Sequence, residues 1–304
     1  MPVDTTCFPR FGTSSWAYEG WQGLVYHRTY PKSRFSQDTL AEYAAYRIHD
    51  TPLFSTVGID HSFYRPASAT QLAHYAEQVP DEFRFCREVW EEITIPAYAN
   101  LPRYGAKAGK PNSRFLDIGA FRDLVLQPAL EGLGQKLGPL IFEFQRWGLE
   151  PAVFLQQLDR FLEQLPPGPA YATEVRNPAI LGPRYRDILR AHGVAHVYNH
   201  WTAMPPLSEQ HQKLTGTFTA PFTVLRLLTP LGLAYEQAVE RYAPYDRIVQ
   251  PQPRMRQETI ALVKQAAADG RSSYVLVNNR SEGCSPLTVQ ALLEALAIPT
   301  DPPL

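Results

Sequence analysis

Cysteine, excess charge and long apolar runs are all scarce in this sequence of 304 residues. Its three cysteines, Cys7, Cys86 and Cys284, are odd in number and far apart along the chain. Neither a disulfide framework nor a cysteine-based zinc cluster is therefore expected. We expect buried, reduced thiols in a cytoplasmic protein.

Charge of one sign is also lacking, because 29 basic residues face 30 acidic ones and the formal net charge is −1. No block of like charge indicates a nucleic-acid partner or a membrane surface. The opening "MPVDTTCFPR" has neither the apolar core nor the cleavage site of a secretory signal. No apolar run approaches the ~18 residues that a membrane span requires.

Hydrophobic residues, by contrast, make up 44% of the chain and recur in short runs that alternate with helical patterns. Runs such as "PLIFEF" and "YVLV" are typical of strands that are covered on both faces. Eight strands are predicted, at 11–16, 53–60, 83–90, 139–145, 170–176, 194–199, 222–228 and 273–279. Eight strand–helix units predict an α/β fold, a (β/α)8 TIM-type barrel in a single domain over residues 1–304.

Helix signals support this alternation. Ser36, Ser68 and Ser285 stand where helix N-caps are expected, and Pro151 stands at a first helical position. Pro128 should kink or split the helix predicted in 115–134.

Two segments, about 91–114 and 229–253, are too long for simple loops. They follow the third and seventh strands. Both should therefore lie at the strand C-terminal face, where barrels of this class keep their sites.

Six stretches carry a family resemblance. They are "GTSSWAYEGWQG" (12–23), "FSTVGIDHSFYRPAS" (54–68), "FRFCREVWEEIT" (83–94), "LGQKLGPLIFEFQ" (133–145), "EVRNP" (174–178) and "YVLVNNRSEGCSP" (274–286). In their order and coverage they resemble the YecE-like family of uncharacterised proteins, domain of unknown function 72. The resemblance implies a TIM barrel but no reaction.

The sequence also departs from that family pattern. The glutamate that the resemblance leads us to expect in the second strand is Gly58. Other departures are Asp60, His61 and Ser62 after that strand, Arg146 and Trp147 after the fourth, Ile180 after the "EVRNP" stretch, and Leu228 and Thr229 after the seventh. A changed substrate and a lost activity both remain open.

Polar residues end nearly every predicted strand, so they should converge on one rim. We expect Asp60, Glu143 and Glu174 to be catalytic. Ligand binding is expected from Trp16, Tyr64, Arg176, Asn199, Arg226, Asn278, Asn279 and Arg280.

Each of these assignments has a structural alternative. Glu174 and Arg176 are two apart on one strand and share a face, so they could form a buried ion pair. Asp60 could cap a turn, Trp16 could seal the core, and the asparagines could belong to a polar loop capped by Ser285. Arg226 has no obvious partner on its own strand and should be the cleaner arginine to mutate.

Three functions fit these residues. The first is an enzyme that acts on a small polar or anionic, sugar- or phosphate-like metabolite by carboxylate acid–base catalysis, for which hydrolysis would be suitable. The second is a ligand-binding barrel without catalysis. The third, a metal-dependent hydrolase or isomerase, requires Asp60, His61, Glu174 and His200 to converge. Because no histidine pair has ligand spacing, we expect neither metal nor cofactor.

Overall fold

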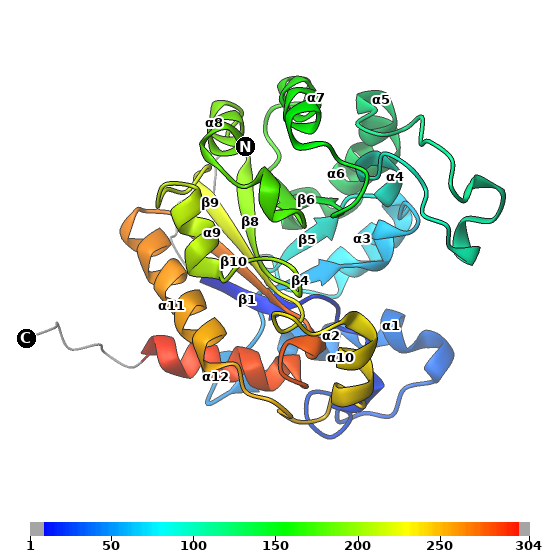
Figure 1. Cartoon of the computed structure of the whole chain (residues 1–304). Helices are drawn as coiled ribbons and strands as arrows, with labels where there is room; N and C mark the ends of the chain where they lie inside the picture. The colour runs from blue at the N-terminus through cyan, green and yellow to red at the C-terminus, as the bar shows by residue number, and fades with distance from the viewer. Residues whose placement is uncertain (1–8, 298–304) are drawn as a thin grey trace, which may run out of the picture.

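Eight parallel strands close into a barrel in the computed structural model, which describes residues 9–297 (Figure 1). The order around the barrel is β1-β10-β9-β8-β7-β6-β5-β4. Their bounds are β1 Pro9–Thr13, β4 Thr56–Ile59, β5 Arg84–Glu88, β6 Leu137–Phe144, β7 Tyr171–Val175, β8 Ala195–His200, β9 Phe222–Leu227 and β10 Ser272–Val277. Each predicted strand overlaps one of these, and the predicted (β/α)8 barrel is confirmed.

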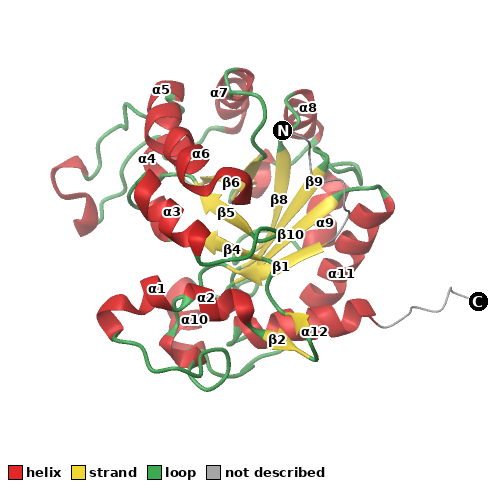
Figure 2. Cartoon of the chain, turned by 180° about the vertical axis from the view of Figure 1, so that it is seen from behind, coloured by secondary structure: helices red, strands yellow, loops and turns green. Residues whose placement is uncertain are grey.

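Helices surround the barrel (Figure 2). The α-helices are α1 Phe35–Asp38, α2 Leu40–Ala45, α3 Ala69–Glu77, α4 Glu91–Thr94, α5 Ile118–Phe121, α6 Gln127–Leu133, α7 Pro151–Glu163, α8 Pro183–Ala191, α9 Leu207–Lys213, α10 Tyr235–Tyr242, α11 Pro253–Ala268 and α12 Ser285–Ala297. Short 3-10 turns are η1 Glu19–Trp21, η2 Lys32–Arg34, η3 His61–Phe63, η4 Pro102–Lys107, η6 Gly134–Lys136, η7 Pro178–Ile180 and η8 Asn279–Ser281. Within residues 9–297, no helix has both the length and the apolar character that crossing a membrane would need.

Local signals account for several helix starts. The Ser68 side chain accepts a hydrogen bond from Gln71 N at 3.2 Å, which is the predicted cap of α3. Pro151 occupies the first position of α7, where its missing N–H leaves no intrahelical bond unmade.

The helix expected after Ser36 is interrupted. It is divided into α1 and α2, and the chain then enters the two-residue strand β2 Arg47–Ile48. This strand pairs in antiparallel fashion with β3 Thr51–Pro52. Neither short strand was predicted, because two residues are too few to show an alternating pattern.

The predicted break at Pro128 is present. The segment is divided into α5, a π-helical turn over Arg122–Leu126, and α6, in which Pro128 lies in the first turn. The carbonyl oxygen of Val125 in that π-helical turn accepts a hydrogen bond from Arg87 Nη1 at 2.6 Å. Arg87 is fully buried on β5, so the irregular helix supplies an acceptor to a buried guanidinium.

The cysteines follow the expectation where the structure describes them. Cys86 and Cys284 are buried free thiols, whereas Cys7 lies outside the described residues.

The barrel interior is built in layers, which decides where polar groups emerge. An apolar layer contains Cys86, Ile141, Ala172, Val197, Val224 and Leu276. Two residues further along the same strands stand Glu88, Glu143, Glu174, Asn199, Arg226 and Asn278. Because side chains alternate along a strand, this second set also points inward, one layer nearer to the strand C-terminal face.

Candidate functional site

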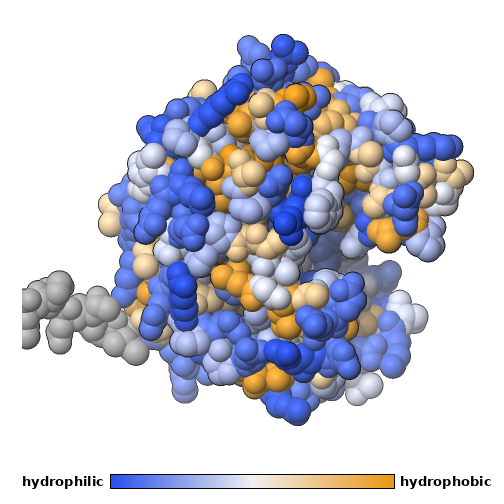
Figure 3. All heavy atoms as spheres, viewed as in Figure 1, coloured by the Kyte–Doolittle hydropathy of each residue, from blue (hydrophilic) through white to orange (hydrophobic). Residues whose placement is uncertain are grey.

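A cavity of about 660 Å³ opens at the strand C-terminal face, above this polar layer. Both long segments noted in the sequence contribute to its wall, the first through Tyr98 and Arg103 and the second through Thr229 and Tyr235. Residues 95–114 are hereafter called the arm. In the space-filling view the surface is hollowed below the arm (Figure 3).

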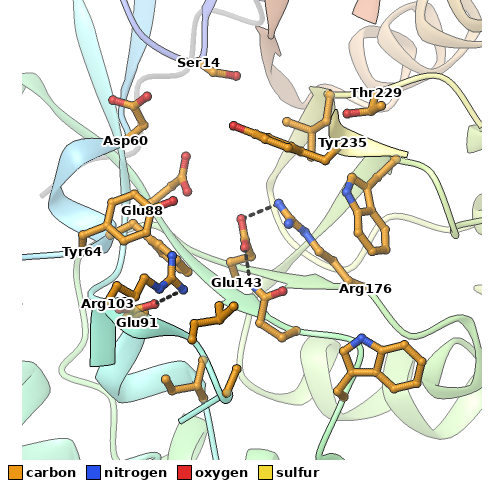
Figure 4. Close-up of a pocket in the computed structure, with 18 of the residues that line it drawn as sticks. Ser14, Asp60, Tyr64, Glu88, Glu91, Arg103, Glu143, Arg176, Thr229 and Tyr235 are labelled. Carbon is orange, nitrogen blue, oxygen red and sulfur yellow. Dashed lines mark hydrogen bonds and ion pairs between the residues drawn. The ribbon is translucent and has the colours of Figure 1, made fainter. Parts of the chain in front are cut away.

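The cavity gathers seven of the residues predicted for the site. These are Asp60, Tyr64, Glu143, Arg176, Arg226, Asn278 and Arg280. In the close-up, Asp60 and Glu88 extend into the cavity from one side, and a dashed line joins Glu143 to Arg176 (Figure 4).

Four predicted residues do not line the cavity. Trp16 is packed in the core, where its indole N–H donates to Ser36 O at 2.8 Å. Asn279 accepts from Ser285 N at 2.9 Å and so anchors the start of α12. Asn199 and Glu174 are fully buried below the cavity floor.

An ion-pair network forms that floor. Arg176 Nη2 lies 2.6 Å from Glu143 Oε2, and Arg176 Nε lies 3.1 Å from Glu174 Oε1. Arg226 donates to Glu143 Oε2 at 2.9 Å, to Glu88 Oε1 at 2.5 Å, and to Glu174. The buried pair proposed for Glu174 and Arg176 is thus present, as one part of a five-residue network.

This network corrects the expectation for Arg226. It has no partner on its own strand, as the sequence indicated, yet it pairs with carboxylates from three other strands. Closure of the barrel brings β5, β6 and β7 to face β9, and residue spacing within one strand contains no information about that contact. Arg226 is therefore a poor choice for a mutation meant to spare the fold.

The three carboxylates of the network differ in how many guanidinium groups they contact. Three carboxylates share two guanidinium groups, and Glu143 and Glu174 each contact both of these. Glu88 contacts Arg226 alone. Burial raises the pKa of Glu88 to about 8 against the opposing effect of Arg226, and the charges of Glu143 and Asp60 raise it further.

Glu174 has the opposite behaviour. Burial would raise its pKa, but the charges of Arg226 and Arg176 outweigh burial and hold the pKa below its usual value. Glu174 is thus an ionised, inaccessible group that fixes the two arginines, whereas Glu88 retains its proton at neutral pH.

Asp60 is the cavity carboxylate without an ion pair among the described residues. It stands just before η3, but its side chain makes no capping hydrogen bond. Burial raises the pKa of Asp60, and the neighbouring His61 opposes that effect. An unpaired carboxylate with a raised pKa is a stronger base than an ordinary aspartate.

The arm closes one side of the cavity through ionic contacts. Arg103 Nη2 lies 3.1 Å from Glu91 Oε2, and the Tyr104 hydroxyl donates to the same oxygen at 2.8 Å. Lys107 and Arg114 contact Glu92 at 2.6 and 3.0 Å. The arm is therefore attached to two consecutive glutamates of α4.

Arginine–aromatic stacking surrounds the mouth. Arg103 stacks on Tyr64, with 5.1 Å between the guanidinium carbon and the ring centre. The same distance is 5.0 Å between Arg176 and Trp201 and 4.5 Å between Arg280 and Tyr235. Arg146 stacks in the same way on Trp147, at 4.9 Å. Such contacts hold planar cations in fixed orientations at the rim.

Several lining residues were given no role from the sequence. Glu88 is one of the polar residues that end the predicted strands, and it follows the buried Cys86 by two positions in "FRFCREVW", but it was not assigned to the site. The arm and rim residues had no such periodic signal. They are Glu91, Tyr98, Arg103, Tyr104, Trp147, Trp201 and Tyr235.

The residues proposed for a metal site do not converge on the cavity. Of Asp60, His61, Glu174 and His200, only Asp60 lines it. Across the part of the chain that the structure describes, no group of three or more His, Cys, Asp or Glu side chains is arranged to hold a metal ion.

Comparison with known proteins identifies the family of this chain. The model of the family described as "Protein of unknown function DUF72" matches residues 10–303. The chain belongs to the DUF72 family. None of the curated proteins matches this DUF72 chain.

Two solved DUF72 structures resemble this member. The DUF72 family protein of Enterococcus faecalis V583 has a TM-score of 0.62 at 16% identity, over 97% of this chain and 97% of its own. The DUF72 family protein of Thermotoga maritima MSB8 has a TM-score of 0.62 at 17% identity, over 94% of this chain and 98% of its own. At these identities the likeness concerns the fold alone.

Gly58, where the resemblance led us to expect a glutamate, has a steric reason in this DUF72 protein. A Cβ atom there would lie 2.5 Å from Ser14 O and 3.2 Å from Ser14 Cα. Both contacts are with backbone, so a side chain would require β4 and the end of β1 to separate. The acidic group in this region of the cavity is instead Asp60, two residues further along the same face.

The raised pKa of Glu88 predicts how stability depends on pH. A carboxyl with a pKa of about 8 in the folded state, against ~4.3 when unfolded, stabilises the fold fully below ~4.3 and loses that contribution as pH rises through 8. The free energy of unfolding should decrease between pH 6.5 and 8.5, and urea unfolding should show that this decrease is smaller by about 1–2 kcal/mol in Glu88→Gln than in the parent protein.

The buried histidines do not contribute to the change in stability between pH 6.5 and 8.5. Burial lowers the pKa of His196 and of His200 to about 4, so their contribution is lost only as pH falls from ~6.5 towards 4. Identical pH dependence of Glu88→Gln and the parent protein above pH 6.5 would contradict a protonated Glu88.

Proposed function

We propose that this DUF72 protein is an enzyme that acts on a small polar metabolite bearing an anionic group, by carboxylate acid–base catalysis, with hydrolysis as the reaction. One observation carries the proposal. A carboxyl group that keeps its proton, Glu88, and an unpaired carboxylate, Asp60, line the same cavity. A carboxyl group that keeps its proton can act as a general acid, and a carboxylate without an ion-pair partner can act as a general base.

The roles follow from these environments. Glu88 donates its proton to the leaving group, and Asp60 accepts a proton from the attacking water. Glu143 accepts hydrogen bonds from Arg176, Arg226 and, at 2.7 Å, Gln145, so most of its acceptor capacity is engaged. We assign it, with Glu174, to positioning the two arginines rather than to proton transfer.

The substrate class follows from the size and lining of the cavity. A volume of about 660 Å³ suits a small molecule. Exposed aromatic rings at the mouth, including Tyr64 and Tyr235, provide flat apolar faces on which a sugar ring can pack. A sugar-like or phosphate-like metabolite fits both features.

The test is a hydrolysis screen with p-nitrophenyl glycosides, phosphates and carboxylic esters. We expect turnover of at least one class by the parent protein and its loss in Glu88→Gln and in Asp60→Asn. Glu163→Gln, a change of an exposed glutamate on α7 outside the cavity, should leave the rate unchanged. Turnover that survives both cavity substitutions would contradict the assignment.

The Gly58 geometry favours a second candidate, a ligand-binding barrel without catalysis, because the family glutamate is sterically excluded there. In that case ligands would stabilise the protein in thermal unfolding, yet no substrate class in the screen would be turned over.

A further inference from the structure

We infer that Arg280 anchors the anionic group of the ligand, a phosphoryl or carboxylate oxyanion, at the side of the cavity formed by the end of β10. This deepens the proposed function, since the anion belongs to the same small molecule, but binding of the anion requires no turnover. The sequence named Arg176, Arg226 and Arg280 together as ligand-binding residues, and the inference selects Arg280 among them as the residue that meets the anion.

Ion pairing distinguishes Arg280 from the other arginines of the cavity. Arg103 pairs with Glu91, Arg176 with Glu143 and Glu174, and Arg226 with three glutamates. Among residues 9–297, no ion pair or side-chain hydrogen bond involves the Arg280 guanidinium. A free oxyanion therefore meets compensated charge at the cavity floor and uncompensated positive charge at Arg280.

Stacking on an aromatic ring, and not a hydrogen bond to a protein acceptor, holds the Arg280 guanidinium in place. The guanidinium stacks on the Tyr235 ring, 4.5 Å from the centre. Its Nε is buried and has no hydrogen-bond partner. A buried N–H that lacks an acceptor is unfavourable, and no described residue satisfies the full donor capacity of this guanidinium. Stacking also limits the entropy that the side chain loses on binding.

Asn278 contributes a second donor at the same place. Its side-chain oxygen accepts from Arg280 N at 3.0 Å, which directs the amide nitrogen away from that contact. Asn278 and Arg280 both line the cavity. A guanidinium and an amide nitrogen on one turn form a small set of donors suited to an oxyanion.

Tyr18 connects this anchor with the proposed base. Burial raises the pKa of Tyr18, the charge of Asp60 raises it further, and the charge of Arg280 lowers it. Tyr18 thus lies within electrostatic reach of both residues, and all three line one cavity. An anion bound at Arg280 would extend the rest of the ligand towards Asp60 and Glu88.

The experiment measures binding of inorganic phosphate and, separately, of succinate by calorimetric titration and thermal unfolding at constant ionic strength. The parent protein should bind at least one of them. Arg280→Gln should weaken that binding at least tenfold, and Arg280→Lys, which keeps the charge but loses the planar fork, should have an intermediate effect. Preference between the two probes identifies a phosphoryl or a carboxylate group.

Arg160→Gln is the matched control, because Arg160 is an exposed arginine on α7 and does not line the cavity. Its affinity should equal that of the parent protein. Equal affinity in Arg280→Gln, or no binding of either anion to the parent protein at millimolar concentrations, overturns the inference. Anion binding lost in Arg280→Gln without any turnover in the screen would leave the inference standing while the proposed function fails.

Discussion

Replacing Arg226 with methionine is expected to lower the free energy of unfolding by about 3–5 kcal/mol at pH 8. Arg226 is buried and contacts Glu88, Glu143 and Glu174. Without it, Arg176 is left as the only cation of the network for these three carboxylates. Buried charges that lose a partner keep their desolvation cost and lose the attraction that offset it.

Denaturant unfolding at pH 5 and pH 8 measures this effect. The loss should be smaller at pH 5, because protonation of the carboxylates can then replace the missing cation. Lys213→Met is the control, since Lys213 makes an exposed ion pair with Glu209 on α9, and such pairs contribute only about 0–1 kcal/mol. A change of less than about 1 kcal/mol in Arg226→Met at pH 8 would mean that the network does not hold the barrel mouth together.

Replacing Glu88 with glutamine is expected to reduce kcat by about 10²–10⁴, the usual contribution of a general acid. The pH profile should change as well. In the parent protein the rate should rise with pH as Asp60 loses its proton and fall near pH 8 as Glu88 loses its own. Glu88→Gln should lack the alkaline fall, and Asp60→Asn should lack the rise at acidic pH.

The measurement is kcat/KM against pH, with the best substrate from the hydrolysis screen. Since the carboxyl groups interact, the two limbs report the titration of the group as a whole. A profile of Glu88→Gln with the same alkaline limb as the parent protein would assign the proton donor elsewhere. Unchanged circular dichroism and thermal unfolding at pH 6.5 would separate lost chemistry from lost structure.

The barrel could be predicted from the sequence because its signals are local and periodic. A strand such as β6 is a near-continuous apolar run, since both of its faces are buried. Ser68 and Pro151 mark helix starts through interactions with their own backbone, which require no knowledge of the rest of the molecule. Strand ends were less well defined, so residues 14–16 were expected in a strand that ends at Thr13.

The site could be predicted only where such periodicity reaches it. Glu143, Glu174 and Arg226 are the next inward positions after apolar residues, and they do gather at one end of the barrel. Which carboxylate meets which arginine depends on the shear of the closed barrel, which no single strand encodes. The pairing of Arg226 across the interior was missed for that reason.

The sequence contained no pattern that could place the loop residues of the site. The length of segment 91–114 indicated a role, but not that Arg103 and Tyr104 would turn back onto Glu91. Trp16 was expected at the cavity because the first strand was predicted to end there, whereas β1 ends at Thr13 and the chain beyond it carries the indole into the core.

The attachment of the arm has a consequence for the shape of the cavity wall. Its three ion pairs all end on Glu91 and Glu92, two neighbouring residues just beyond β5. One wall of the cavity is therefore held to the barrel through side chains of a single short helix, α4, and by the bonds of Asn112 to Glu92 O and Ile95 O, both 2.7 Å. Loss of charge at these two glutamates would therefore release all three cations of the arm at once, so the shape of this wall depends on one short segment of the chain.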